Sequence, residues 1–307
     1  MGSKKNKLGD FLSPLTKSNK LEIIETFDVA IIIELYKRQV NIDVSRYFNE
    51  LEEISLIKCV ETGYLFYAPF SVVGDDRFYE ELSTTRTNYY SERWEHKKII
   101  EFLTEKDKIL EIGSGFGAFI KLLHENKIFD IKGLELNKLA VAECVSSGLN
   151  VEAKLIEEEA LTKFEYYTVV CSFQVLEHIT GVYEFIESSL KTLKKDGKLI
   201  IGVPNNNPYI FISDKWHTFN LPPHHAGLWN KNSLKSLEKI FPIKLANLEH
   251  EPLENTYDYF LNIQILNANY FKKTFLKGLN KITPNLLKFF YCSFVKGRNV
   301  LAVFVKY

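Results

Sequence analysis

From residue 108 onward, short apolar segments alternate with segments of helical periodicity. The apolar segments that we expect to form strands lie at 108–112, 131–136, 151–156, 167–173, 198–203, 243–248 and 299–305. The segments that we expect to form helices lie at 118–125, 138–146, 182–193 and 232–240. Short strands that alternate with helices are typical of a parallel sheet whose two faces are both covered by helices. The sequence therefore predicts an α/β fold for this part of the chain.

The residues before this alternating pattern predict a tail and a small N-terminal cap. Residues 1–20 are polar and rich in lysine, and we expect them to form a disordered tail. The cap is expected over 21–103, with a helix near 28–37, a hairpin that turns at Thr62-Gly63, and a lead-in helix over 88–103. The main domain then covers 104–307, and a basic helical insertion interrupts it at about 257–297.

Composition and charge narrow the class of protein. The chain has 39 basic and 39 acidic residues, so its formal net charge of zero gives no support to a surface for nucleic acids or other polyanions. Its 4 cysteines are scattered and form no Cys-x-x-Cys pair, which predicts neither a disulfide framework nor a zinc knuckle. No segment resembles a secretory signal or reaches the roughly 18 apolar residues of a membrane-spanning helix. We therefore expect a cytoplasmic protein.

A glycine-rich loop, Glu111-Ile-Gly-Ser-Gly-Phe-Gly117, joins an expected strand to an expected helix. Glycines permit a tight turn and let a ligand approach the backbone, and the helix N-terminus presents unpaired N–H groups. Glu135 ends the next strand, where a carboxylate can accept hydrogen bonds from ribose hydroxyls. These features suit an adenosine-containing ligand, either a nicotinamide dinucleotide or S-adenosylmethionine. Ala118 stands where the dinucleotide pattern requires a glycine, which disfavours the first of these ligands.

Four segments of the chain together resemble the successive motifs of the class I S-adenosylmethionine-dependent methyltransferases. They lie at 111–117, 133–137, 170–178 and 193–204, in the order and spacing of that family, and the resemblance covers roughly 104–250. It implies a Rossmann-like, doubly wound sheet of seven strands, mainly parallel with an antiparallel last strand, beside the small cap. It also implies S-adenosyl-L-methionine as the cofactor.

The resemblance further implies roles for individual residues. In this family the glycine loop cradles the methionine part of the cofactor, the acidic residue after the second strand holds the ribose, and residues after the fourth strand line the reaction site. Carried over, the cofactor-binding residues are Glu111, Gly113, Ser114, Gly115, Gly117, Glu135, Leu136, Glu157, Phe173, Gln174 and Arg93. The residues expected to contact the substrate are Glu177, Asn205 and Tyr90.

Two of these assignments depart from the family pattern or have an alternative. The family's adenine-binding step is blurred in Leu155-Ile-Glu-Glu-Glu-Ala160, where Glu157 is the residue we select. Arg93 and Tyr90 lie just before the first strand, where the family often closes a lid over the cofactor. An arginine there can pair with the carboxylate of the methionine part. The alternative for this segment is a solvated amphipathic helix.

A pair of histidines follows the fifth expected strand, within His217-Thr-Phe-Asn-Leu-Pro-Pro-His-His-Ala-Gly-Leu-Trp229. This loop should lie above the carboxyl edge of the sheet, where ligands bind in such folds. A hydroxyl or amine acceptor must lose a proton, and histidine is the most frequent base. His224, His225 and His178 are therefore the candidate catalytic residues. Packing within the loop, or capping of the next helix, is the alternative. We expect no metal, because no ligand spacing demands one.

The Pro-Pro-His-His step resembles a loop of small-molecule methyltransferases that act on sugars and glycan precursors. The segment Cys59-x-x-Thr-Gly-x-x-Phe66 in the cap resembles bacterial members of that group. We therefore expect O-methylation of a sugar, a glycan precursor or a related small polar metabolite, in carbohydrate biosynthesis. A lipid-linked or aromatic acceptor, and a cofactor-binding protein without catalysis, are the alternatives. A nucleic-acid acceptor is disfavoured, because Ser172-Phe-Gln-Val replaces the Asp/Asn-Pro-Pro-aromatic loop.

The last part of the chain is basic and aromatic. From Tyr259 to Tyr307 it contains no Asp or Glu, and its cationic residues are Lys272, Lys273, Lys277, Lys281, Lys288, Lys296, Arg298 and Lys306. Such a stretch can rest on an anionic membrane surface through 259–307. It can also form a homodimer interface, or pack its apolar residues on the domain with the lysines in water. We favour the packed arrangement.

Overall fold

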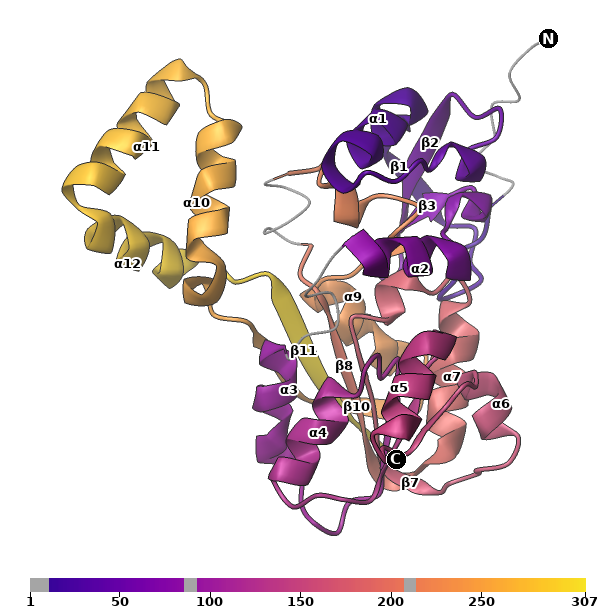
Figure 1. Ribbon diagram of the computed structural model, residues 1–307. Helices are drawn as coiled ribbons and strands as arrows, with labels where there is room; N and C mark the ends of the chain where they lie inside the picture. The colour runs from indigo at the N-terminus through magenta and orange to yellow at the C-terminus, as the bar shows by residue number, and fades with distance from the viewer. Residues whose placement is uncertain (1–10, 86–92, 207–213) are drawn as a thin grey trace.

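The structure, a computed structural model, describes residues 11–85, 93–206 and 214–307 (Figure 1). A seven-stranded sheet forms its centre, in the order β10-β11-β8-β7-β4-β5-β6. The strands are β4 (Ile109–Ile112), β5 (Ile131–Leu134), β6 (Val151–Glu152), β7 (Tyr167–Phe173), β8 (Leu193–Pro204), β10 (Ile243–His250) and β11 (Asn299–Lys306). Strands β4 to β8 pair in parallel, and β11 is antiparallel to both of its neighbours. The predicted Rossmann-like sheet with an antiparallel last strand is confirmed.

Helices cover both faces of this sheet. They are α3 (Trp94–Ile99), α4 (Ala118–Glu125), α5 (Lys138–Ser146), α6 (Ile156–Ala160), α7 (Val182–Thr192) and α9 (Lys231–Lys235). Alternate residues of a strand point to opposite faces, so Leu110 packs in one core cluster with residues of α7 and α9. Its neighbour Ile109 packs in another cluster with residues of α3, α4 and α5. This two-sided burial explains why the central strands are apolar at nearly every position.

The cap is built on a second sheet, in the order β1-β2-β3-β9. Its elements are β1 (Leu21–Asp28), α1 (Val29–Val40), β2 (Glu53–Cys59), β3 (Leu65–Ala68), α2 (Asp76–Thr85) and β9 (Gly227–Leu228). The hairpin between β2 and β3 turns at the predicted glycine, Gly63, which has a φ of 69°. Strand β9 comes from the loop that carries the histidine pair, so a segment of the main domain completes the sheet of the cap.

Short 3-10 helices connect several of these elements. They lie at Ser45–Tyr47, Phe70–Val72, Ile100–Phe102, Leu176–His178, Thr218–Asn220, Ser236–Lys239 and Leu253–Thr256. The helix predicted over 232–240 is therefore α9 followed by a 3-10 turn, and Asn230, not a histidine, caps its start. The lead-in helix predicted over 88–103 is described from Trp94 only, because 88–92 lie outside the described residues.

Two predictions from the sequence are wrong in part. The strand predicted at 151–156 ends at Glu152, and α6 begins at Ile156. Acidic residues in its first turn complement the helix dipole, and the Glu158 carboxylate accepts a hydrogen bond from the N–H of Leu155. The predicted disordered tail is wrong for 11–20, because Leu15 is fully buried in the core. Residues 1–10 lie outside the described residues.

Three helices stand between β10 and β11, and we call residues 257–294 the helical arm. They are α10 (Tyr257–Leu266), α11 (Tyr270–Ile282) and α12 (Pro284–Phe294), and they project from the rest of the molecule (orange to yellow in Figure 1). The arm has its own small core, which includes Tyr257, Phe260 and Leu287. Many of its large apolar side chains are exposed: Leu266, Tyr270, Phe271, Phe275, Ile282, Leu286, Phe289, Phe290 and Phe294.

The favoured packing of this segment on the domain is therefore wrong. Because β10 and β11 pair directly with each other, the first and last residues of the arm join the main sheet at the same place. Most of the arm's surface does not pack on the rest of the molecule. Among the helices that the structure describes, none is both long enough and apolar enough to span a bilayer.

We predict that Leu15→Ala lowers the free energy of unfolding by about 2–5 kcal/mol, because it removes a fully buried side chain from the core. Leu12, three positions earlier, is 52 % exposed and is the matched control. Leu12→Ala should change stability by less than about 0.5 kcal/mol. Denaturant unfolding of both variants measures the difference. Equal stability of the two variants would show that 11–20 do not pack in solution.

Candidate active site

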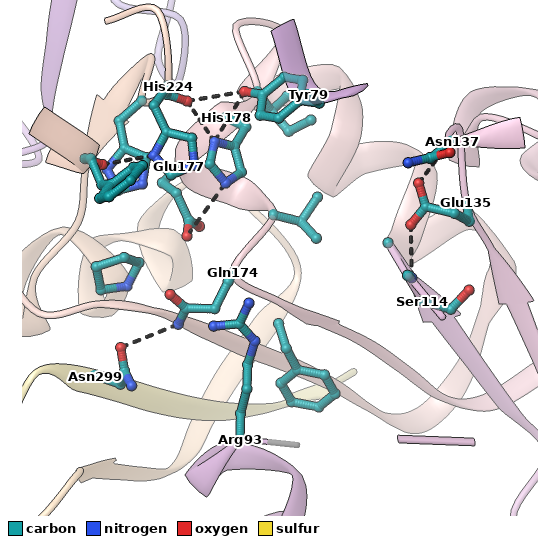
Figure 2. A pocket seen from close by; sticks show the side chains of 18 of the residues that line it. Tyr79, Arg93, Ser114, Glu135, Asn137, Gln174, Glu177, His178, His224 and Asn299 are labelled. Carbon is teal, nitrogen blue, oxygen red and sulfur yellow. Dashed lines mark hydrogen bonds and ion pairs between the residues drawn. The ribbon is translucent and has the colours of Figure 1, made fainter. Parts of the chain in front are cut away.

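A cavity of about 740 Å³ lies at the carboxyl edge of the main sheet, a size usual for small-molecule sites. Its wall comes from the loops that follow β4, β5 and β7, from the cap helix α2, and from the start of β11. Figure 2 shows Ser114 and Glu135 on one side of it and His178 and His224 on the other. The cavity thus has a glycine-loop end and a histidine end.

The glycine loop requires glycine at more than one position. Gly113, Gly115 and Gly117 have φ values of 78°, 53° and 73°, in the left-handed region that favours glycine. A Cβ on Gly113 would lie 2.4 Å from a methyl carbon of Val175, and a Cβ on Gly117 would lie 2.5 Å from Leu149. Gly113 and Gly115 line the cavity, whereas Gly117 starts α4 behind it. Backbone strain and close packing therefore explain the spacing of these glycines.

Glu135 connects the loop to the end of β5. Its Oε2 accepts a hydrogen bond of 2.7 Å from the N–H of Gly115, and its Oε1 accepts one of 2.8 Å from the N–H of Asn137. These bonds hold the carboxylate at the cavity wall, and each oxygen retains a lone pair for a further donor. Leu136 lies beside it in the wall and is half exposed. This is the arrangement expected of a group that accepts from ribose hydroxyls.

Two polar side chains of the glycine loop have buried atoms without a hydrogen-bond partner among the described residues. These atoms are Oε2 of Glu111 and Oγ of Ser114. Burial raises the pKa of Glu111 well above its usual value, and the negative charge of Glu135 adds to this. Buried acceptors without donors are costly, and a ligand that brings an ammonium group would relieve that cost. The amino-acid part of S-adenosylmethionine carries such a group, so these residues fit the predicted cofactor.

The middle of the cavity is formed by residues after β7 and by α3. Phe173 packs edge-on against Phe119, with ring centroids 5.2 Å apart. Gln174 has a φ of 56°, and its Nε2 donates a hydrogen bond of 2.7 Å to Oε1 of the buried Glu95. Arg93 lines the same region. The structure therefore brings Phe173, Gln174 and Arg93 together as the sequence predicts, and it adds Glu95 as the partner of Gln174 outside the cavity wall.

Two other predicted residues, Glu157 and Asn205, are not found at the cavity, and the position of a third, Tyr90, is not described. Glu157 lies on α6 and does not belong to the cavity wall. Asn205 does not belong to it either, and donates its side-chain N–H to the carbonyl of Gly297 at 3.0 Å. Asn205 is turned away because the antiparallel pairing of β8 with β11 places that carbonyl beside it. Tyr90 lies outside the described residues.

Three histidines meet at the other end of the cavity. Nδ1 of His178 lies 2.6 Å from the carbonyl oxygen of His224, and Nδ1 of His224 lies 2.8 Å from that of Phe219. Nδ1 of His225 lies 3.2 Å from Oδ1 of Asn220. Burial lowers the pKa of His178 to about 4 and the pKa of His225 well below its usual value. Both imidazoles are therefore neutral at neutral pH and can accept a proton.

Two further groups orient these imidazoles. The hydroxyl of Tyr79, from the cap helix α2, donates to the carbonyl of His224 at 3.0 Å and lies 3.2 Å from Nδ1 of His178. Oε1 of Glu177 lies 3.8 Å from Nε2 of His178 (Figure 2). Burial raises the pKa of Glu177 to about 8. Glu177 and His178 line the cavity as predicted, whereas nothing in the sequence near Tyr79 indicated a role for it.

The start of β11 and the segment before it also reach the cavity, which the sequence did not indicate. Arg298, Asn299, Glu251 and His217 all line the cavity. The side chain of Asn299 donates to the Glu251 carboxylate at 2.9 Å. Glu251, Arg298 and Asn299 reach the cavity because β11 pairs with β8 and β10, which aligns residues far apart in the sequence. The cavity wall is consequently polar and includes both acidic and basic side chains.

Comparison with known proteins finds a methyltransferase domain in the chain. Residues 86–249 match a family model described as a methyltransferase domain, which is more than half of the chain. A ubiquinone biosynthesis O-methyltransferase of Pseudomonas fluorescens is 25 % identical over 171 residues, covering 49 % of this chain and 71 % of the relative. One of the same name from Saccharophagus degradans is 23 % identical over 218 residues, covering 64 % and 86 %. A crystal structure of a SAM-dependent methyltransferase from Archaeoglobus fulgidus covers 75 % of this chain and 99 % of its own, at 16 % identity and a TM-score of 0.49.

The sheet order, the glycine loop and the acidic residue that follows β5 define a class I methyltransferase. The chain belongs to the methyltransferase family whose domain it matches, and it is an S-adenosylmethionine-dependent methyltransferase. The prediction of S-adenosyl-L-methionine as the cofactor is confirmed.

We predict that Glu135→Ala weakens the binding of S-adenosylmethionine by about 10- to 100-fold, because it removes a charged hydrogen-bond acceptor from the ribose and releases the N–H of Gly115. Titration calorimetry measures the affinity. The exposed Glu105 lies outside the cavity wall, and Glu105→Ala is the control with unchanged affinity. NAD should not bind either variant or the parent chain. An unchanged affinity in Glu135→Ala would remove Glu135 from the cofactor site.

Proposed function

We propose that the chain transfers a methyl group to a hydroxyl oxygen of a small polar acceptor, and that a sugar or glycan precursor is the preferred class. The observation that supports this most is the histidine end of the cavity, where three imidazoles, two of them buried, lie opposite the glycine loop. A role in carbohydrate biosynthesis and a cytoplasmic location belong to the same proposal.

The glycine-loop end holds the cofactor in this proposal. Glu135 accepts from the ribose hydroxyls, and Glu111 with Ser114 receives the ammonium group. Arg93 pairs with the carboxylate of the methionine part. When bound, S-adenosylmethionine supplies an electrophilic methyl group on a sulfonium. The residues of the chain align the acceptor with that group, and such alignment supplies much of the acceleration of a displacement reaction.

The histidine end prepares the acceptor. A carbonyl oxygen only accepts hydrogen bonds, so the contacts at Nδ1 of His178 and His224 place the ring proton on that nitrogen. Nε2 is then the basic nitrogen, and one of the three imidazoles takes the hydroxyl proton as the oxygen attacks. Arg298 and Asn299 in the same wall can bind further hydroxyl groups. A polyhydroxylated acceptor uses more of these groups than an apolar one.

We predict that His224→Ala or His225→Ala lowers kcat on the true acceptor by about 10²- to 10⁴-fold, because the residue that accepts the proton is lost. Turnover is measured by methyl transfer to a panel of nucleotide sugars and glycan precursors. His124, on α4 outside the cavity wall, gives the control His124→Ala, which should keep the full rate. Full activity of both single variants would exclude these residues as the base.

A second candidate is a lipid-linked or aromatic acceptor, and the helical arm is the observation that favours it. Phe271 and Phe289 are 82 % and 71 % exposed, and the exposed lysines of the arm accompany them without any acidic residue after Asp258. Exposed aromatics beside lysines complement an anionic bilayer surface. The relatives named for ubiquinone biosynthesis also favour this class. We propose that the arm rests on an anionic membrane and presents such acceptors to the site.

We predict that the chain co-sediments with vesicles of phosphatidylglycerol and phosphatidylcholine at low salt, and that binding falls as salt screens the lysines. The double variant Phe271→Ala with Phe289→Ala should bind at least about tenfold more weakly. Phe129→Ala, at a side chain 66 % exposed outside the arm, is the control. Absence of binding, or a dimer that dissociates in this double variant without vesicles, would assign the arm to another role.

A further inference from the structure

The histidine end of the cavity has a geometry that proton transfer alone does not require. His178, His224 and His225 each offer one donor atom, and these atoms all lie within 4.8 Å of one another. His178 comes from the 3-10 turn after β7, and the other two come from the loop before β9. One imidazole is enough for a general base. Three converging imidazoles, of which those of His224 and His225 are buried, are a ligand set that suits a metal ion.

The hydrogen bonds of the three rings prepare them as ligands. The carbonyl oxygens at Nδ1 of His178 and His224 fix the proton on that nitrogen, and Oδ1 of Asn220 occupies the same position beside His225. Each ring then presents the electron pair of Nε2. Metal-binding histidines donate their other ring N–H to carbonyl or carboxylate oxygens in the same way, which orients the ring. Tyr79 strengthens this arrangement, because it also donates to the carbonyl of His224.

A carboxylate lies beside the three imidazoles. Oε1 of Glu177 is 3.8 Å from Nε2 of His178, and its Oε2 is buried without a hydrogen-bond partner among the described residues. Glu177 itself is 1 % exposed. A divalent cation at this point would bring together the three nitrogens and neutralise this buried carboxylate.

We propose that His178, His224 and His225 bind a divalent transition-metal ion of the zinc type, with Glu177 as a neighbouring carboxylate ligand. Three nitrogens and one oxygen suit Zn²⁺ or Co²⁺ better than Mg²⁺ or Ca²⁺, which take mostly oxygen ligands. The sequence predicted no metal because these residues do not have the short spacing of known motifs. The fold, not the local sequence, brings position 178 to positions 224 and 225.

Binding requires a small adjustment of the rings. Bonds of about 2.0–2.1 Å place the nitrogens around a tetrahedral ion roughly 3.3 Å apart. The rings of His224 and His225 are stacked, with centroids 4.6 Å apart and planes at 19°. One of them must therefore tilt toward His178, whose ring is steeply inclined to both.

The catalytic role of the ion rests on the proposed function, whereas the binding of the ion to the three histidines does not. The histidines line the cavity, so a fifth coordination position there can take the acceptor hydroxyl and make it more acidic. In the loaded chain the hydroxyl proton would pass to solvent water, because the three imidazoles would be bound to the ion and could not serve as the base.

The test is titration of the chelator-stripped full chain with Co²⁺, without cofactor or acceptor. We expect one equivalent to bind and to give the visible absorption of tetrahedral Co²⁺, and Zn²⁺ to displace it. His178→Ala and His225→Ala should each weaken Co²⁺ binding at least about 100-fold. Loss of a hydrogen-bond partner of a ligand already lowers metal affinity about 10- to 100-fold, and loss of the ligand itself costs at least as much. His124→Ala, away from the cavity, should bind like the parent chain.

Absence of stoichiometric Co²⁺ binding by the parent chain, or equal binding by His178→Ala, overturns the metal site. Calorimetry with S-adenosylmethionine on the same samples separates this result from a failure of the proposed function. Unchanged cofactor affinity in a variant also shows that the variant is folded. His225→Gln, which keeps a polar side chain of similar reach, is the second variant and should lose Co²⁺ binding as well.

Discussion

Two backbone hydrogen bonds at Ala226 hold the cap and the main sheet together, and the site depends on them. The N–H of Ala226 donates to the carbonyl of Glu177 at 2.8 Å, and its carbonyl accepts from the N–H of Tyr67 at 2.9 Å. One residue thus ties the 3-10 turn that follows β7 to strand β3 of the cap. The histidine pair immediately before it is held above the carboxyl edge of the sheet. Trp229, fully buried against Tyr64 with ring centroids 4.4 Å apart, closes the same junction.

Buried carboxyl groups that lack full pairing lie in the cavity wall or, for Glu95, against a residue of that wall. Burial raises the pKa of Glu95, Glu111 and Glu177, and one oxygen of each has no hydrogen-bond partner among the described residues. Such groups are costly in the empty chain. A ligand with positive charge relieves this cost, which fits a sulfonium that also carries an ammonium group. The unpaired carboxyl groups lower the stability of the empty chain, and binding of the cofactor recovers part of that free energy.

The sequence predicted the parts of the fold that local patterns determine. Apolar runs located the central strands, because both faces of a parallel sheet are buried, and the loop at 111–117 located the cofactor. The histidine pair was found because its members are adjacent. Tyr79 and Asn299 were missed, because α2 and β11 reach the cavity only through the tertiary fold. The helical insertion at about 257–297 was predicted, but its exposure was not, because an amphipathic pattern does not show whether a partner covers its apolar side.

The place of the helical arm in the sheet has a consequence for how the family can vary. The chain leaves the main sheet for the arm and returns to it at neighbouring points. The N–H of Glu251 donates to the carbonyl of Asn299 at 2.9 Å, and the N–H of Gly297 donates to the carbonyl of Glu251 at 2.8 Å. Strands β10 and β11 need only a short hairpin to keep this pairing. Insertions between such closed ends cost little in chain entropy. The arm is thus a module that evolution can lengthen, exchange or delete while the sheet and its register stay the same.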